Sequence, residues 1–376
     1  MLIFTFFLFS APFFVYFYSY LFSKYAKNFG INFFFTALII PSIFFYIEYF
    51  YFFNNLFGVR LILLFLLIYC VFMGKRYFLE NKWDFSKFYL SYVIFCFLCI
   101  FVANISHEGE GVTDLFFVNN YFHASSLPPD NTWFSIGKFE SYYAFFYYCV
   151  ALFSRIFSVK TIYSFQIAFV FGLAMCLYYS WKYCEFYFRS YKAFFLAFFL
   201  LTASSGIAVF SPFMRGNFNY LENIQIETNL MDIHRFLGNE GGKNHAASFL
   251  YEYVEGEPRL DFDNFIYTFN IGVIHPIFVG FIILFFFIYL IKLREDSIKD
   301  ELLDGLIGYL LILSYICHAW IFPLMLIIVT CYIIRRCLIE KKFINSIWII
   351  IGSVTAMIVY FPLVESITLS SAGYNS

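Results

Sequence analysis

Charged side chains are scarce in this chain: Asp, Glu, Lys and Arg make up 13% of its 376 residues, whereas 62% are apolar. A water-soluble protein needs a charged surface, so this composition excludes a soluble globular fold. The net charge of -1 offers no basic field for nucleic acid, and no nucleic-acid partner is expected. The bilayer must therefore replace water around most of the chain.

The two long polar stretches, 106–141 and 213–264, contain no cysteine, although the chain has 9. Disulfides and a cysteine-ligated zinc site are therefore not expected there. No Lys or Arg precedes the first apolar run, so we expect a retained helix and not a cleaved signal peptide. The chain also lacks an internal repeat and the paired interrupted helices of many secondary transporters.

Apolar runs long enough for membrane helices fill much of the chain. They are roughly Leu2 to Phe22, Ile31 to Phe53, Arg60 to Gly74, Phe88 to Ile105, Thr161 to Trp181, Ala193 to Pro212, Phe265 to Ile291, a double run from Gly305 to Ile334, and Phe343 to Phe361. The predicted fold is an all-α, polytopic transmembrane protein with about ten crossings. It comprises a four-helix membrane region (1–105), a first outer loop with surface helices (106–160), and membrane helices with a second outer loop at 213–264 (161–376).

One further run, Tyr142 to Phe157, is too short to be assigned by length, so the positive-inside rule decides its path. If it lies along the outer surface, 16 of the 24 Lys and Arg residues fall on the cytoplasmic side; if it crosses, the split is 12 to 12. We therefore place it on the surface. Both long loops then face outward and hold 14 of the 25 Asp and Glu residues.

The first outer loop carries two carboxylates, Glu110 and Asp114, four residues apart. If Val112 to His123 forms a short helix along the membrane, both carboxylates share one face with Val118. Such a pair can bind a divalent cation or provide a general base. The alternative is a solvated acidic turn at the end of a helix.

Several residues after this pair resemble a known family, the archaeal and chloroflexal tyrosine-run ("YYY") membrane proteins. The matching residues are Glu110, Asp114, Asn119, Pro128-Pro129, Trp133 and Tyr142-Tyr143, followed in order by Gly216-Asn217, Asp263, His275-Pro276, and Trp320 with Pro323. Val273-Ile274 and Ile277 stand where the family usually has an Asp and a second His. That family is similar in turn to the GT-C-type glycosyltransferases that use polyprenyl-phosphate sugars.

The resemblance implies a GT-C-like membrane protein that transfers sugar from a polyprenyl-phosphate donor to a glycan or lipid acceptor, at the extracytoplasmic face of a prokaryotic membrane. It implies Asp114 as the base for the acceptor hydroxyl, with Glu110 as its partner or as a ligand of Mg or Mn. The residues expected to contact the substrate or its phosphate are His123, Trp133, Lys138, Tyr142, Tyr143, Arg215, Arg235, Arg259, His275, His318 and Trp320.

Three of the polar residues near or within apolar runs have more than one interpretation. His275, which precedes Pro276, either satisfies a local hydrogen bond or has a role in phosphate binding or proton transfer. His318, at the predicted outer turn, has either a structural or a functional role, and the structural one is favoured. Glu48, a carboxylate within an apolar run, is a candidate for a functional role, but it stands near the outer end of its run, where it is expected to snorkel. For the whole chain the alternatives are a polysaccharide polymerase that depends on arginines of the second loop, a lipid or glycan transporter, and a non-catalytic membrane subunit.

Overall fold

The structure, a computed structural model, describes residues 2–24, 28–51, 56–101, 110–130, 144–202, 276–296, 301–318, 321–338 and 346–361. Within these stretches the chain forms 12 α-helices and one short 3-10 helix. The predicted all-α class is therefore confirmed for the part of the chain that the structure describes.

The helices follow the apolar runs closely. Their bounds are α1 (Leu2–Tyr18), η1 (Ser19–Phe22), α2 (Phe29–Tyr51), α3 (Leu56–Met73), α4 (Lys75–Phe101), α5 (Glu110–His123), α6 (Ala144–Phe157), α7 (Thr161–Cys184), α8 (Ser190–Thr202), α12 (Pro276–Asp296), α13 (Glu301–Cys317), α14 (Ile321–Leu338) and α15 (Ser346–Val359). The turn between α13 and α14 lies at His318, where the sequence predicts it.

Several of these helices are long and apolar enough to cross a bilayer, which indicates a multi-pass membrane protein. Four described segments meet that test, namely Thr5–Phe22, Phe29–Phe50, Thr161–Cys184 and Ile321–Leu338. The bent pair α3 and α4, with an angle of 91° at Gly74, is a fifth candidate. The total of about ten crossings stays a prediction.

The start of α4 differs from the prediction, which placed a helix from Phe88 onward. The helix begins at Lys75, directly after Gly74. A Cβ atom at Gly74 would lie 2.5 Å from the carbonyl oxygen of Cys70, so the sharp bend requires glycine. In this polar first half of α4, Asp84 and Lys87 bond to the end of α7, as described below.

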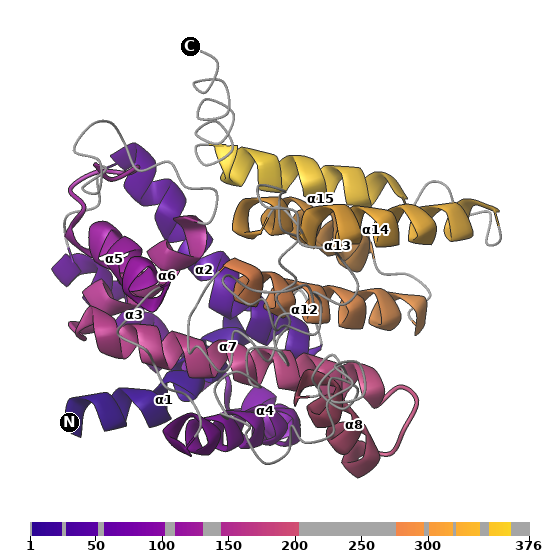
Figure 1. The fold of residues 1–376 in the computed structure, drawn as a ribbon, viewed down its shortest axis with the longest axis horizontal. Helices are drawn as coiled ribbons and strands as arrows, with labels where there is room; N and C mark the ends of the chain where they lie inside the picture. Colours follow the sequence, from indigo (N-terminus) through magenta and orange to yellow (C-terminus); the bar gives the residue numbers. More distant parts are fainter. Residues whose placement is uncertain are drawn as a thin grey trace, which may run out of the picture.

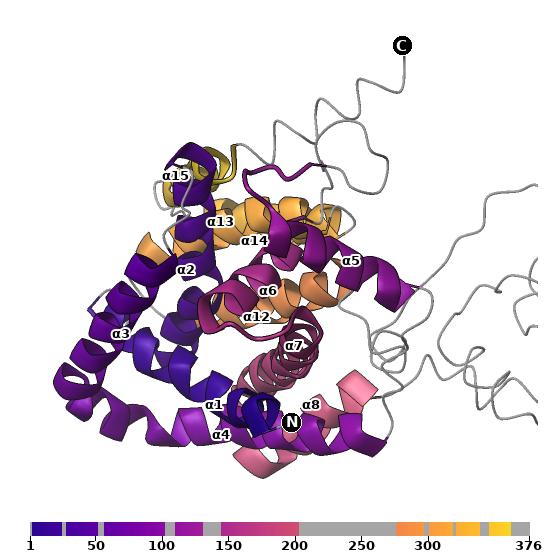
Figure 2. The ribbon, with the colours of Figure 1, turned by 90° about the vertical axis from the view of Figure 1, so that its left-hand side faces the viewer.

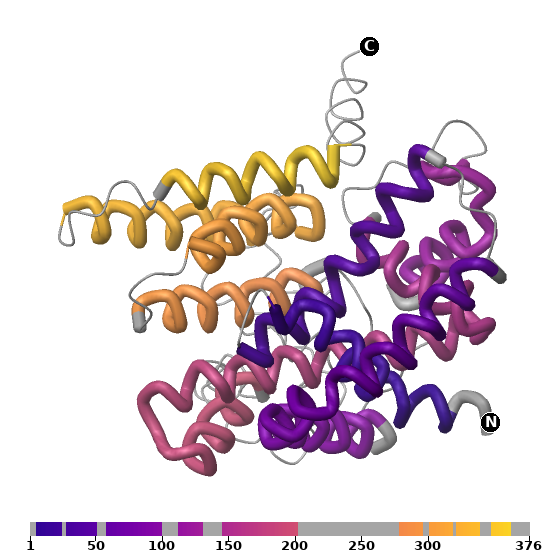
Figure 3. Tube along the Cα trace, turned by 180° about the vertical axis from the view of Figure 1, so that it is seen from behind, coloured from indigo at the N-terminus to yellow at the C-terminus, as the bar shows by residue number. Residues whose placement is uncertain are grey.

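Helix α7 forms the centre of the molecule, since 16 of its 24 residues are buried. It contacts α4, α6, α8 and α12. Figure 1 shows α15, α13, α12 and α7 stacked from top to bottom, and Figure 3 shows the same C-terminal layer from behind. In Figure 2, which looks nearly along α7, helices α5 and α6 lie across its near end.

Helices α13 and α15 approach each other through glycines. A Cβ atom at Gly308 would lie 1.9 Å from the carbonyl oxygen of Ile349, and one at Gly352 would lie 1.8 Å from that of Gly305. The Ser353 hydroxyl donates to the Gly308 carbonyl at 3.1 Å. Small residues with a cross-helix hydroxyl bond are typical of helix packing in membranes, where no hydrophobic effect drives helices together.

Gly308→Ala is expected to lower the unfolding free energy by about 1–3 kcal/mol, because the added methyl group forces the two backbones apart. Gly305→Ala is the matched control, since a Cβ atom there meets its nearest atom, the Trp348 carbonyl oxygen, at 3.7 Å. Thermal unfolding in detergent compares the two variants. Equal melting temperatures for both would contradict the close packing.

Charged side chains gather at the end of α7 that lies away from α5 and α6. Lys182 bonds to Asp84 at 3.0 Å, and Lys87 bonds to Glu185 at 2.8 Å, so α4 and α7 are joined by two ion pairs. The Ser190 hydroxyl at the start of α8 also donates to Glu185, at 2.6 Å. These contacts hold three helices together at one end of the bundle.

Stability in acid is expected to depend on Glu185. Burial alone would raise the pKa of the Glu185 carboxyl, but hydrogen bonds from Lys87 and Ser190 outweigh it and hold that pKa below its ordinary value of 4.5. The stabilisation is therefore complete above pH 4.5 and is lost as the pH falls through the lowered pKa. Glu185→Gln should lower the melting temperature by a few degrees at pH 7, and this difference should shrink in acid.

The control for this prediction is Glu80→Gln. Glu80 also accepts from a basic side chain, Arg76, but that pair is exposed, and exposed pairs contribute little. Its melting temperature should match that of the unaltered protein at every pH. A Glu185→Gln deficit that persists unchanged in acid would mean that the carboxylate charge is not the cause.

Candidate functional site

Helix α5 presents one buried face to α6. Asp114, Val118 and Tyr121 follow each other at helical spacing and are 2%, 0% and 1% exposed. The predicted short helix and the shared face of Asp114 and Val118 are confirmed. Glu110 is the first residue of α5, but its side chain lies outside the described residues. The interpretation of Asp114 as part of a solvated turn is wrong, because packing against α6 removes it from solvent.

The Asp114 carboxylate is held by a tyrosine of α6. The Tyr147 hydroxyl donates to Asp114 Oδ1 at 2.5 Å, and Tyr147 itself is 1% exposed. A buried carboxylate is costly unless it is hydrogen-bonded, and a bond to a charged acceptor is stronger than a neutral one. Tyr147 therefore fixes the position of the carboxylate at the α5–α6 contact.

Asn119 joins α5 to the beginning of α7. Its Oδ1 atom accepts from the Thr161 hydroxyl at 2.6 Å. Pro128 and Pro129 follow α5 in an irregular segment, consistent with the predicted end of the helix. Asp114 and Asn119, two of the residues that resemble the tyrosine-run family, thus both lie on α5 at one end of the bundle.

The other side of α6 carries an ion pair. Arg155 donates to Glu48 at 2.6 Å, and the side chains are 14% and 6% exposed. The Tyr148 ring lies 5.8 Å from the Arg155 guanidinium, close enough for a cation–π contact. Glu48 does not snorkel as predicted, because Arg155 supplies a buried partner. Both residues are charged and lie within apolar runs. Two opposite charges in such positions were the signal from which an ion pair could have been predicted.

A second arginine, Arg60 of α3, binds the end of α6. It donates to the Ile156 carbonyl at 2.8 Å, to the Arg155 carbonyl at 2.9 Å and to the Ser158 hydroxyl at 2.6 Å. These carbonyls belong to the last turn of the helix, whose partial negative charge favours a cation. No local sequence pattern indicates this contact, since Arg60 precedes Ile156 by 96 residues.

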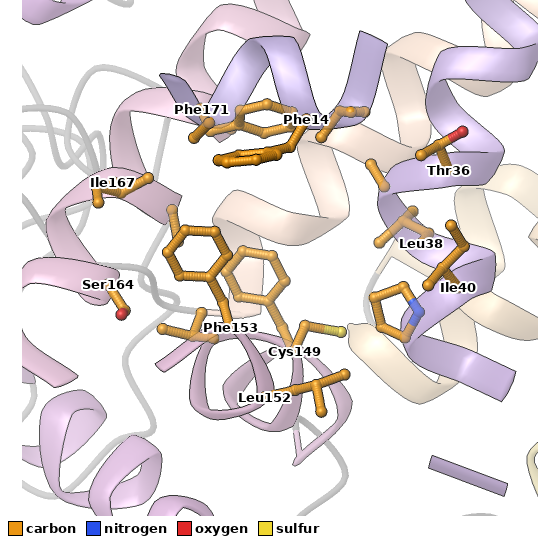
Figure 4. Close-up of a pocket in the computed structure, with 18 of the residues that line it drawn as sticks. Phe14, Thr36, Leu38, Ile40, Cys149, Leu152, Phe153, Ser164, Ile167 and Phe171 are labelled. Atoms are coloured by element: carbon orange, nitrogen blue, oxygen red, sulfur yellow. The ribbon is translucent and has the colours of Figure 1, made fainter. Parts of the chain in front are cut away.

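An apolar cavity of about 220 Å³ lies between α1, α2, α6 and α7. Figure 4 shows Phe14, Leu38, Cys149, Phe153 and Phe171 around it. Pro41 within α2 also lines it, where the helix cannot make its regular hydrogen bond. The lining is almost entirely apolar, and water does not enter such a space readily.

The remaining predicted site residues fall into three groups. His123 ends α5 and is exposed. His318 is buried and its Nδ1 atom accepts from the backbone N–H of Ile321 at 3.2 Å, so it caps α14. The others lie outside the described residues: Trp133, Lys138, Tyr142, Tyr143, Arg215, Arg235, Arg259, His275 and Trp320. The structure therefore does not place the predicted phosphate-binding arginines.

The described residues contain no cluster of three or more His, Cys, Asp or Glu side chains that could hold a metal ion. Glu110, the proposed second ligand, is not covered by that statement. A divalent cation at Asp114 stays a prediction.

Comparison of the chain with protein-family models, with curated proteins and with solved structures gives no match. The resemblance to the tyrosine-run family thus stays a prediction.

Proposed function

We propose that this multi-pass membrane protein transfers sugar from a polyprenyl-phosphate donor to a glycan or lipid acceptor, with Asp114 as the general base. The observation that carries the proposal is the buried, oriented Asp114 carboxylate between two short helices at one end of a bundle of membrane helices. Helix α6 has 14 residues and is about 21 Å long, too short to span the hydrocarbon core. It supports a surface layer of the kind that the resemblance implies.

The sidedness in this proposal follows from the basic residues. Lys182 and Arg294 lie in the last turns of α7 and α12, away from α5 and α6, and Lys87 of α4 bonds to Glu185 just after α7. Basic residues favour the cytoplasmic side. Asp114 is then extracytoplasmic, where lipid-linked donors would meet their acceptors. The proposed location is a prokaryotic cell membrane.

In the proposed reaction the acceptor hydroxyl gives its proton to Asp114 as its oxygen bonds to the anomeric carbon of the sugar. The bond from that carbon to the phosphate oxygen breaks, and polyprenyl phosphate leaves with the electron pair. Asp114 is 2% exposed in the structure, so the acceptor must displace part of α5 from α6 to reach it. Because Tyr147 is on α6, its bond to Asp114 holds the carboxylate in position only until the acceptor displaces α5.

The test is a transfer assay with purified protein in vesicles. A panel of polyprenyl-monophosphate hexoses with radiolabelled sugar is offered together with delipidated cell-envelope glycan and with membrane lipid as acceptors. We expect one donor to lose its label to an acceptor with release of polyprenyl phosphate. Turnover of no donor in the panel, by protein that retains its melting temperature, would oppose the proposal.

A second candidate is a non-catalytic membrane subunit. It is favoured by the nearly complete burial of Asp114 and by its bond to Tyr147, which together suffice for a purely structural role. In that case a neutral substitution of Asp114 changes stability and leaves the activity of any associated enzyme proportional to the amount of folded protein.

A further inference from the structure

The last residues of α6 both line the apolar cavity and bind Arg60. Ile156 and Phe157 line the apolar cavity, and the Ile156 carbonyl accepts from Arg60. Leu63, one turn after Arg60 on α3, lines the same cavity. Arg60 therefore lies at the margin of the cavity, at the end of the bundle where α3 begins.

This margin is positively charged. Arg60 donates its three hydrogen bonds to two carbonyls and a hydroxyl. None of these acceptors is a carboxylate, so none of them neutralises the charge of Arg60. Lys160, two residues beyond Ser158, is exposed at the start of α7. Arg155 is neutralised by Glu48. Arg60 is thus a cation beside an apolar cavity in a membrane protein, and Lys160 is a second exposed cation on the chain segment that follows α6.

We propose that this site binds an anionic phospholipid of the bilayer, with the headgroup phosphate on Arg60 and one acyl chain in the cavity. The charge matches a phosphate, and Arg60 Nη1, which makes none of the three bonds above, is the group that would donate to it. The apolar lining matches hydrocarbon, and a filled cavity regains the contacts that an empty one lacks. The site is separate from the Asp114 contact and does not depend on the proposed sugar transfer.

The size of the cavity matches part of one hydrocarbon chain. An engineered cavity of about 150 Å³ binds one benzene ring. A cavity of about 220 Å³ therefore takes a stretch of one hydrocarbon chain, and the rest of that chain would lie outside it in the bilayer.

Lipid retained by the purified full chain tests the proposal. The protein is reconstituted in vesicles of equal phosphatidylglycerol and phosphatidylcholine, extracted in mild detergent, and analysed by native mass spectrometry. We expect phosphatidylglycerol to be retained at about one per chain, Arg60→Gln to reduce it at least tenfold, and Phe153→Trp to reduce it by filling the cavity. Lys82→Gln, a basic residue beside Trp83 on the polar half of α4, is the control and should have no effect.

Loss of folding in Arg60→Gln is checked by its melting temperature, and the unaltered protein provides an independent measurement. Added phosphatidylglycerol should raise its melting temperature more than phosphatidylcholine does. Equal retention of the two lipids, or loss of phosphatidylglycerol in Lys82→Gln to the same degree as in Arg60→Gln, would overturn the site. Displacement of the retained phospholipid by equimolar polyprenyl phosphate would overturn the assignment of its occupant.

Discussion

Asp114→Asn is expected to reduce sugar transfer by about 100-fold or more, because the amide cannot take the proton of the acceptor hydroxyl. Asparagine has nearly the shape of aspartate, and its side-chain oxygen can still accept from the Tyr147 hydroxyl. The fold should therefore survive. Transfer is measured with the donor identified in the vesicle assay, and the melting temperature is measured on the same preparation.

Two further variants serve as a control and a comparison for Asp114→Asn. Asp130→Asn neutralises an exposed carboxylate beyond the proline segment and should leave transfer unchanged. Tyr147→Phe keeps the Asp114 charge and removes its donor, so it should lower transfer less than Asp114→Asn does. If Asp114→Asn keeps normal transfer per folded molecule and only lowers the melting temperature, Asp114 has a structural role and the proposed base is wrong.

Asp304→Asn is expected to destabilise the protein by about 3–5 kcal/mol, since it leaves two buried guanidinium groups without their shared carboxylate. Arg294 bonds to Asp304 at 2.9 Å and Arg336 at 3.0 Å, while Tyr332 donates to it at 3.1 Å. Asp304 is 0% exposed, and the two arginines are 3% and 4% exposed. This cluster joins α12, α13 and α14.

The measurement is thermal unfolding and the yield of monodisperse protein. Glu301→Gln, an exposed carboxylate in the first turn of the same helix, is the control and should behave as the unaltered protein. Equal yield and melting temperature for Asp304→Asn and Glu301→Gln would show that the cluster does not hold these helices together.

The features that could be predicted from the sequence are those that depend on the spacing of nearby residues. Apolar run length located the helices, and the spacing of Asp114 and Val118 placed them on one face of α5. The same reasoning missed the first half of α4, because its stabilising contacts are ion pairs with α7 that no local pattern contains.

Side-chain contacts between residues far apart in the chain also could not be predicted from local sequence patterns. Tyr147 is 33 residues from Asp114, and Arg155 is 107 residues from Glu48. Arg60 was counted only as a charge in the topology argument, and the fold gives it a place beside the cavity. Spacing along one helix says which residues share a face, but the residue opposite that face is set by how the helices pack.

The most direct test of the account is the sidedness of α5. In a cysteine-free background, single cysteines replace His123 and Tyr187, both exposed, and intact cells are treated with a membrane-impermeant thiol reagent. Position 123 is a better probe than 114, which is buried. The account predicts labelling at 123 and protection at 187. Protection at 123 with labelling at 187 would place Asp114 on the cytoplasmic side, away from the proposed donor, and would contradict the extracytoplasmic site.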